Sequence, residues 1–138
     1  MRSLAAAILW VVAAQAALAQ AVSEPDLSGV WDGKYSYMAS AGRQEVPFLL
    51  QLSVLRASVS GRITEPNTFG DRSSDKLFAS VVGIVEGRRL RLVKTYDGTA
   101  GQRHSVYYEG TVDPGAMTIT GNWVMSERWG GTFEAKRR

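Results

Sequence analysis

Apolar and polar residues alternate with a period of two in eight stretches of the chain after residue 22. A period of two places successive side chains on opposite faces of an extended segment, so each stretch predicts a β-strand with one buried face. No stretch of this part keeps a helical spacing for three turns, and the pattern therefore predicts an all-β domain. The expected strands cover residues 27–38, 46–55, 58–65, 77–85, 88–96, 104–112, 117–125 and 129–136.

The connections between these strands are short at one end of the expected sheet and mostly long at the other. This asymmetry predicts an eight-stranded antiparallel up-and-down meander barrel with one open mouth, because functional loops gather on one rim of a scaffold. A two-sheet sandwich stays open as the alternative, since alternation alone does not separate it from a barrel. The short turns are 56–57, 86–87 and 113–116, and the connections at the mouth are 39–45, 66–76, 97–103 and 126–128.

Turn lengths and the alternating pattern together predict which residues lie opposite one another. The turn 86–87 would place Leu90 opposite Gly83, and the turn 113–116 would place Tyr108 opposite Gly121. The last hairpin would place Phe133 opposite Gly121 as well. The residues expected to face inward are Trp31, Tyr35, Tyr37, Phe48, Leu50, Leu52, Val59, Ile63, Val81, Leu90, Leu92, Val106, Tyr108, Ile119, Trp123 and Phe133.

Residues 1–21 have the form of a secretory signal peptide. They combine a positive start at Arg2, an apolar run from Leu4 and a small-residue exit around Ala19. The apolar run is short for a membrane span, and polar chain follows it, so no transmembrane segment is expected once the leader is removed. Residues 22–138 then form a single β-barrel domain, which we expect in the bacterial periplasm or outside the cell.

Composition narrows the function classes. The chain has no cysteine, so no disulfide supports the exported domain, and closing a sheet on itself is one way to stabilise it. Arg2 is the one charged residue of the leader, and its removal lowers the formal charge from +3 to +2. A charge this small does not favour a nucleic-acid partner. The basic groups at 88–91 and 136–138 are therefore interpreted as a solvated turn and tail.

The two ends of the domain resemble the calycin group, which includes lipocalins, avidins and fatty-acid-binding proteins. Gly29-Val-Trp31 is similar to the G-x-W motif of the first lipocalin strand, and the last strand ends in Lys136-Arg137-Arg138. The resemblance implies a lipocalin-like barrel in which Trp31 plugs the closed end and Arg137 or a neighbour covers its ring. It carries over no ligand-contacting residue, because that group varies them freely.

Several hydrogen-bonding side chains are expected to point inward near the long loops. Above an apolar floor, such a ring of polar groups is typical of a small-molecule pocket. Lys94 is the most specific of them, because an inward lysine must snorkel, pair with Glu65 or meet a ligand anion. The candidate ligand-binding residues are Tyr37, Glu65, Lys94, Tyr96, His104 and Trp123.

Catalytic and metal sites find little support in the sequence. His104 is the only histidine, so it lacks a second histidine for a metal and a Ser-Asp arrangement for a triad. The acidic segment 71–75 lacks the ligand spacing of a calcium loop. We therefore expect no catalytic residue, no metal and no cofactor. Phe69, within the loop 66–76, would act either as a lid over the mouth or as an anchor at its rim.

Three functions are open at this point. The leading hypothesis is a non-enzymatic barrel that binds a small, largely apolar ligand at the long-loop mouth. The alternative is a filled-core interaction module, such as an inhibitor or envelope adaptor, whose long loops bind a protein partner. A barrel enzyme with Lys94, Tyr96, His104 and Glu65 as acid and base lacks a group that positions them. Eight strands enclose an interior that is either filled or just able to hold a ligand.

Overall fold

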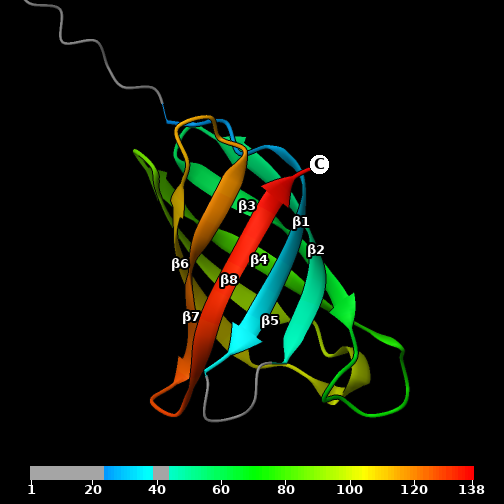
Figure 1. The fold of residues 1–138 in the computed structure, drawn as a ribbon. Helices are drawn as coiled ribbons and strands as arrows, with labels where there is room; N and C mark the ends of the chain where they lie inside the picture. Colours follow the sequence, from blue (N-terminus) through cyan, green and yellow to red (C-terminus); the bar gives the residue numbers. More distant parts are fainter. Residues whose placement is uncertain (1–23, 39–43) are drawn as a thin grey trace, which may run out of the picture.

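The computed structural model describes residues 24–38 and 44–138, so the expected leader at 1–21 lies outside the described residues. Eight antiparallel strands follow one another in chain order and close into a barrel, because the first strand also pairs with the last (Figure 1). The predicted all-β up-and-down barrel is confirmed, and the sandwich alternative is wrong. The strands are β1 (Gly29–Tyr37), β2 (Glu45–Leu55), β3 (Ser58–Pro66), β4 (Lys76–Glu86), β5 (Arg89–Tyr96), β6 (Ser105–Val112), β7 (Thr118–Ser126) and β8 (Trp129–Arg137).

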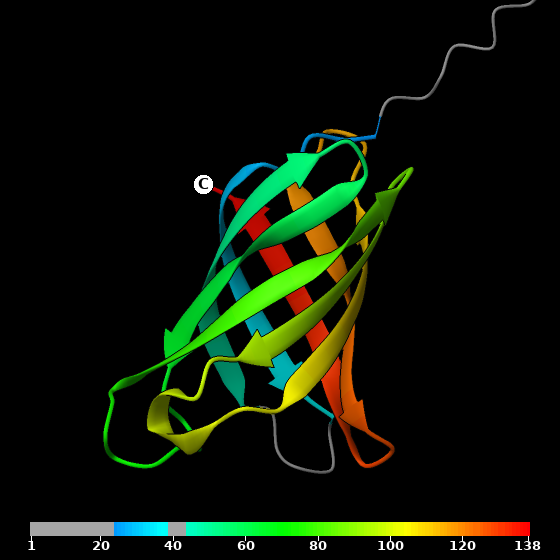
Figure 2. The same cartoon turned by 180° about the vertical axis from the view of Figure 1, so that it is seen from behind.

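The two ends of the barrel differ as expected. The chain end after β8 and the turns β2–β3, β4–β5 and β6–β7 lie at one end (Figures 1 and 2). At the other end, the loop 67–75 and the loop 97–104, which holds the short 3-10 turn η2 (Thr99–Gly101), lie side by side. In the described part of the chain, no helix is long and apolar enough to cross a membrane.

The predicted inner face is confirmed almost completely. All of the residues expected to face inward are buried except Tyr37, which is half-buried at the mouth. One glycine of this face is required by packing: a Cβ on Gly33 would lie 2.1 Å from the ring of Phe48, its partner on β2. Gly33 therefore gives Phe48 room to lie across β1 in the interior.

The predicted register of the β4–β5 hairpin is wrong by two residues. Leu90 lies opposite Val85, not Gly83, because the turn is Gly87-Arg88. Gly87 adopts a φ of 57°, a left-handed conformation that favours glycine in tight hairpin turns. A shift of two residues keeps every side chain on its face, and the predicted inner set therefore survives the error.

The β6–β7 hairpin departs from the prediction in the same way. Tyr108 lies opposite Trp123, not Gly121. The carboxylate of Asp113 accepts hydrogen bonds from the backbone N–H groups of residues 117 and 118, each at 2.7 Å. The connection therefore covers residues 113–117 instead of the expected 113–116. In the last hairpin, Phe133 lies opposite Gly121 as predicted, although its connection contains two residues instead of three.

Candidate functional site

Trp31 and Arg137 seal the closed end of the barrel. Trp31 is fully buried and donates a hydrogen bond from Nε1 to the backbone oxygen of Leu27 at 3.0 Å. The guanidinium carbon of Arg137 lies 4.4 Å from the centre of the Trp31 ring, so the predicted basic cover is confirmed. The guanidinium also donates to the backbone carbonyls of Asp26 (2.7 Å), Ser28 (2.7 Å) and Ala116 (3.0 Å).

A buried ion pair lies toward the other end of the interior. Lys94 and Glu65 are 1% and 2% exposed, and Lys94 Nζ donates to Glu65 Oε2 at 2.7 Å. The hydroxyl of Tyr96 donates to the other oxygen of Glu65. Of the three outcomes expected for Lys94, pairing with Glu65 is the one observed, and both carboxylate oxygens are used.

The strand register explains how the pair forms. Glu65 on β3 lies opposite Leu77 of β4, and Lys94 on β5 lies opposite Val81 of β4. Ala79 occupies the inward position between those two β4 residues. Its methyl group is small enough to let the long lysine side chain cross β4 and reach the carboxylate.

Aromatic rings surround the ammonium group. Lys94 Nζ lies 4.5 Å from the ring centre of Tyr96, 5.4 Å from that of Tyr35 and 6.0 Å from that of Tyr108. Burial lowers the pKa of Lys94, and the Glu65 carboxylate offsets part of this effect. Burial, followed by the negative charge of Glu65, raises the pKa of all three tyrosines, so their hydroxyls are uncharged.

A cavity of about 480 Å³ lies at the mouth. Four of the six predicted site residues line it: Tyr37, Tyr96, His104 and Trp123. The rings of Tyr37 and Trp123 meet edge to face, with centres 5.3 Å apart and an interplanar angle of 88°. Glu65 and Lys94 are not in the lining, because they lie buried beneath it and hold Tyr96 in place.

Other residues of the lining were not predicted as site residues. Tyr35, Val106 and Tyr108 belong to the predicted inward set, so their position in the strands could have identified them. Trp129 is 49% exposed, and its ring centre lies 6.3 Å from that of Tyr37. From the sequence, an exposed Trp129 before Gly130-Gly131 indicates either an interaction patch or a ring that shields these glycines, and neither reading places it in the lining. The further members of the lining are Phe69, Gln102 and Met125.

Phe69 joins the loop 67–75 to the rim. Its ring centre lies 5.6 Å from that of Tyr96 and 5.8 Å from that of His104. The loop is also held by the Asn67 side chain, which bonds three backbone groups within it, and by the Asp71 N–H, which donates to the Ala100 carbonyl at 2.9 Å. These contacts favour the anchor role of Phe69 over that of a lid.

His104 lies on the rim as an uncharged imidazole at neutral pH. Its ring centre is 4.7 Å from that of Tyr96, and it is half-buried. Partial burial lowers the pKa of His104 below its ordinary value of 6.5, and the positive charge of Lys94 lowers it further. Protonation of His104 would thus place a positive charge beside an aromatic cavity.

No protein-family model matches this sequence, and a search of curated proteins finds no significant match. Among residues 24–38 and 44–138, no cluster of three or more His, Asp or Glu side chains could hold a metal ion. The function is therefore inferred from the geometry of the mouth.

Proposed function

We propose that this protein is a non-enzymatic binding barrel that holds one small, largely apolar ligand in the aromatic cavity at its mouth. The observation that carries the proposal is the cavity of about 480 Å³, walled mainly by aromatic rings. Pockets for small molecules measure about 300–1,000 Å³ and combine apolar walls with a few polar groups. Gln102 and His104 supply such groups here.

The lining favours an uncharged ligand. The side chains that line the cavity are uncharged at neutral pH, since the pKa of His104 lies below its ordinary value and the pKa values of Tyr35, Tyr96 and Tyr108 are raised. Beneath them, the ammonium of Lys94 is already matched by Glu65. An anionic ligand would have to displace that carboxylate, whereas a flat apolar ligand needs only the ring faces and edges.

Binding rather than catalysis is favoured by the state of the three titratable groups beneath the cavity. Lys94, Glu65 and Tyr96 bond one another and are all buried. A general acid or base must come within hydrogen-bond reach of the atom that it serves. Here, Lys94 and Glu65 lie outside the lining, and the hydroxyl of Tyr96 donates a hydrogen bond to Glu65.

The calycin relationship and the export of the protein are part of this proposal. The first is supported by Trp31 of the G-x-W motif, which lies beneath Arg137 at the closed end. The second is supported by the leader-like sequence of residues 1–21. N-terminal sequencing of protein recovered from the medium or periplasm of its host tests the export, with cleavage near Ala19 as the expected result.

The test of binding uses purified protein and the uncharged apolar dye N-phenylnaphthylamine. We expect native mass spectrometry to detect a retained small molecule, and the dye to bind in a saturable way with increased fluorescence. Gln102→Trp adds a large ring at the mouth and should weaken dye binding. Leu55→Trp, at the exposed β2–β3 turn of the closed end, is the matched control and should not.

The proposal fails if no bound molecule is detected and neither the dye nor a panel of lipids and aromatic compounds binds. It also fails if Gln102→Trp and Leu55→Trp bind the dye equally well, because the dye then lies outside the mouth.

A further inference from the structure

A row of apolar side chains crosses the outside of four neighbouring strands. Val82 on β4, Val93 on β5, Tyr107 on β6 and Val124 on β7 are successive partners in the strand register. Val82 is 58%, Tyr107 55% and Val124 48% exposed, and a surface groove of about 550 Å³ runs over the row. Isolated exposed apolar residues are ordinary, but a contiguous patch marks an interaction surface.

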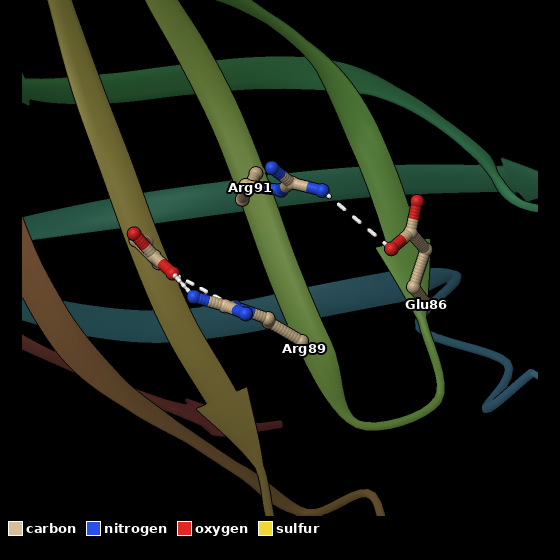
Figure 3. Close-up of polar contacts among 4 residues, drawn as sticks. Glu86, Arg89 and Arg91 are labelled. Carbon is tan, nitrogen blue, oxygen red and sulfur yellow. Dashed lines mark hydrogen bonds and ion pairs between the residues drawn. The ribbon is translucent and has the colours of Figure 1, made fainter.

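A charged row lies next to the apolar one. Arg91 on β5 and Glu109 on β6 are register partners and lie two residues away from Val93 and Tyr107. Arg91 Nη2 lies 3.5 Å from Glu86 Oε2, and Arg89 Nε donates a hydrogen bond to Glu109 Oε1 (Figure 3). These exposed side chains can accept a further partner, since Arg91 is 52% and Glu109 53% exposed.

Row by row, the outward residue of β5 complements the outward residue of β6. The apolar row offers Val93 and Tyr107, and the charged row offers Arg91 and Glu109. On the mouth side of the apolar row, two hydroxyls follow, Thr95 and Ser105, which are register partners too. On these two central strands, apolar residues therefore lie level with apolar ones, hydroxyls with hydroxyls, and a basic residue with an acidic one.

From this complementarity we propose that the outer face of β4–β7 is a dimer interface between two copies of the chain. A two-fold axis parallel to the strands, between β5 and β6, places β5 of one copy on β6 of the other. Val93 then faces Tyr107 of the second copy, and Arg91 faces its Glu109. Each contact occurs twice, as the symmetry of an isologous dimer requires.

A second copy suits this face better than an unrelated protein does. Nothing in the binding of an unrelated protein requires one half of the patch to complement the other half, whereas self-association does. The larger Tyr107 side chain lies over the smaller Val93, and the opposite charges lie beside this apolar contact. The same symmetry leaves both mouths open at one end of the dimer, so dimerisation and the proposed ligand binding are independent.

The first test measures self-association of the full domain by sedimentation equilibrium. We expect a concentration-dependent dimer, and Tyr107→Glu should raise its dissociation constant by more than about tenfold, because a charge replaces the central apolar contact. Leu55→Glu changes an exposed apolar residue outside the face and should leave the dimer intact. A monomer up to millimolar concentration, or equal dimerisation by wild type and Tyr107→Glu, overturns the proposal.

The second test examines the symmetry with charge reversal. Arg91→Glu alone places two acidic groups opposite each other in the dimer, and Glu109→Arg alone places two basic groups opposite each other. Each variant should be monomeric, but their mixture should form a heterodimer, because both contacts then join opposite charges. Circular dichroism confirms that both variants are folded.

The control variants are Lys34→Glu and Glu45→Lys, each measured alone. They carry the same changes in net charge on β1 and β2, across the barrel from the proposed interface, and each should dimerise as the wild type does. If a control variant is monomeric as well, or if the test mixture remains monomeric, the proposed placement of Arg91 against Glu109 is wrong.

Discussion

Both ends of the barrel place a cation against an aromatic ring, but the two cations are held in different ways. At the closed end, Arg137 lies 4.4 Å from the ring centre of Trp31 and is bonded to backbone carbonyls. At the open end, Lys94 lies 4.5 Å from the ring centre of Tyr96 and is bonded to the carboxylate of Glu65. The first arrangement needs no acidic side chain, whereas the second does.

In the proposed function, this difference separates a structural end from the end that binds the ligand. Arg137 stays partly in water, so it closes the barrel at little desolvation cost. Lys94 and Glu65 are withdrawn from water, and the attraction within such a pair hardly exceeds the cost of burying it. Its contribution here is to orient the Tyr96 hydroxyl beneath the cavity, which an apolar pair would not do.

The largest effect should come from breaking the pair at the open end. Glu65→Gln leaves the Lys94 ammonium buried without a counter-charge and should lower the free energy of unfolding by about 3–5 kcal/mol, measured by urea denaturation. The double variant Glu65→Leu with Lys94→Met removes both charges and should recover most of this loss. A Glu65→Gln loss below about 1 kcal/mol would contradict the described pairing.

A smaller loss is expected at the closed end. Arg137→Met keeps an apolar stem over Trp31 but removes the three hydrogen bonds to backbone carbonyls, and should cost about 1.5–3 kcal/mol in urea denaturation. Dye affinity at the mouth should not change. If the dye affinity fell together with the stability, the two ends would be coupled, and the separation of roles would be wrong.

Substitution at the rim should weaken dye binding and leave the free energy of unfolding nearly unchanged. Trp129→Ala removes an exposed ring from the cavity wall and should weaken dye binding by about fivefold, roughly 1 kcal/mol, in a fluorescence titration. The free energy of unfolding should stay within about 0.5 kcal/mol of wild type, as is usual for surface positions. Leu55→Ala, an exposed residue of the closed end, is the matched control and should change neither quantity.

The smallest expected effect is a pH dependence of binding. The pKa of His104 in the folded protein lies below the ordinary 6.5, so the unfolded chain binds this proton first. The stability that the neutral imidazole contributes is therefore fully present above about pH 6.5, the ordinary pKa of histidine, and is lost as the pH falls toward the lowered pKa of the folded protein. Dye affinity should weaken by a few-fold over the same range, since a charged rim disfavours an apolar ligand.

His104→Phe is the variant that isolates this effect. It keeps an aromatic ring against Tyr96 and removes the titrating group, so its dye affinity should be flat between pH 7 and 5, while that of wild type falls. Equal slopes for the two proteins would assign the pH dependence to another group.

Much of the fold could be read from the alternation of side chains. The period of two assigns each residue to a face, and an error of two residues in a hairpin leaves that face unchanged, as Leu90 and Tyr108 show. The same rule placed Lys94 and Glu65 inside, and four of the residues that it predicted as a binding site line the cavity. It could not name Trp129, because its place at the rim depends on how β8 begins.

What the sequence by itself determined is therefore the set of inward residues, the order of the strands and the end at which the long loops gather, since these follow from a local repeat. Only the tertiary structure decided that the mouth holds a cavity, that Lys94 pairs with Glu65 across β4, and that Phe69 reaches Tyr96 and His104. These depend on distances between side chains far apart in the chain, which barrel closure and loop packing set together.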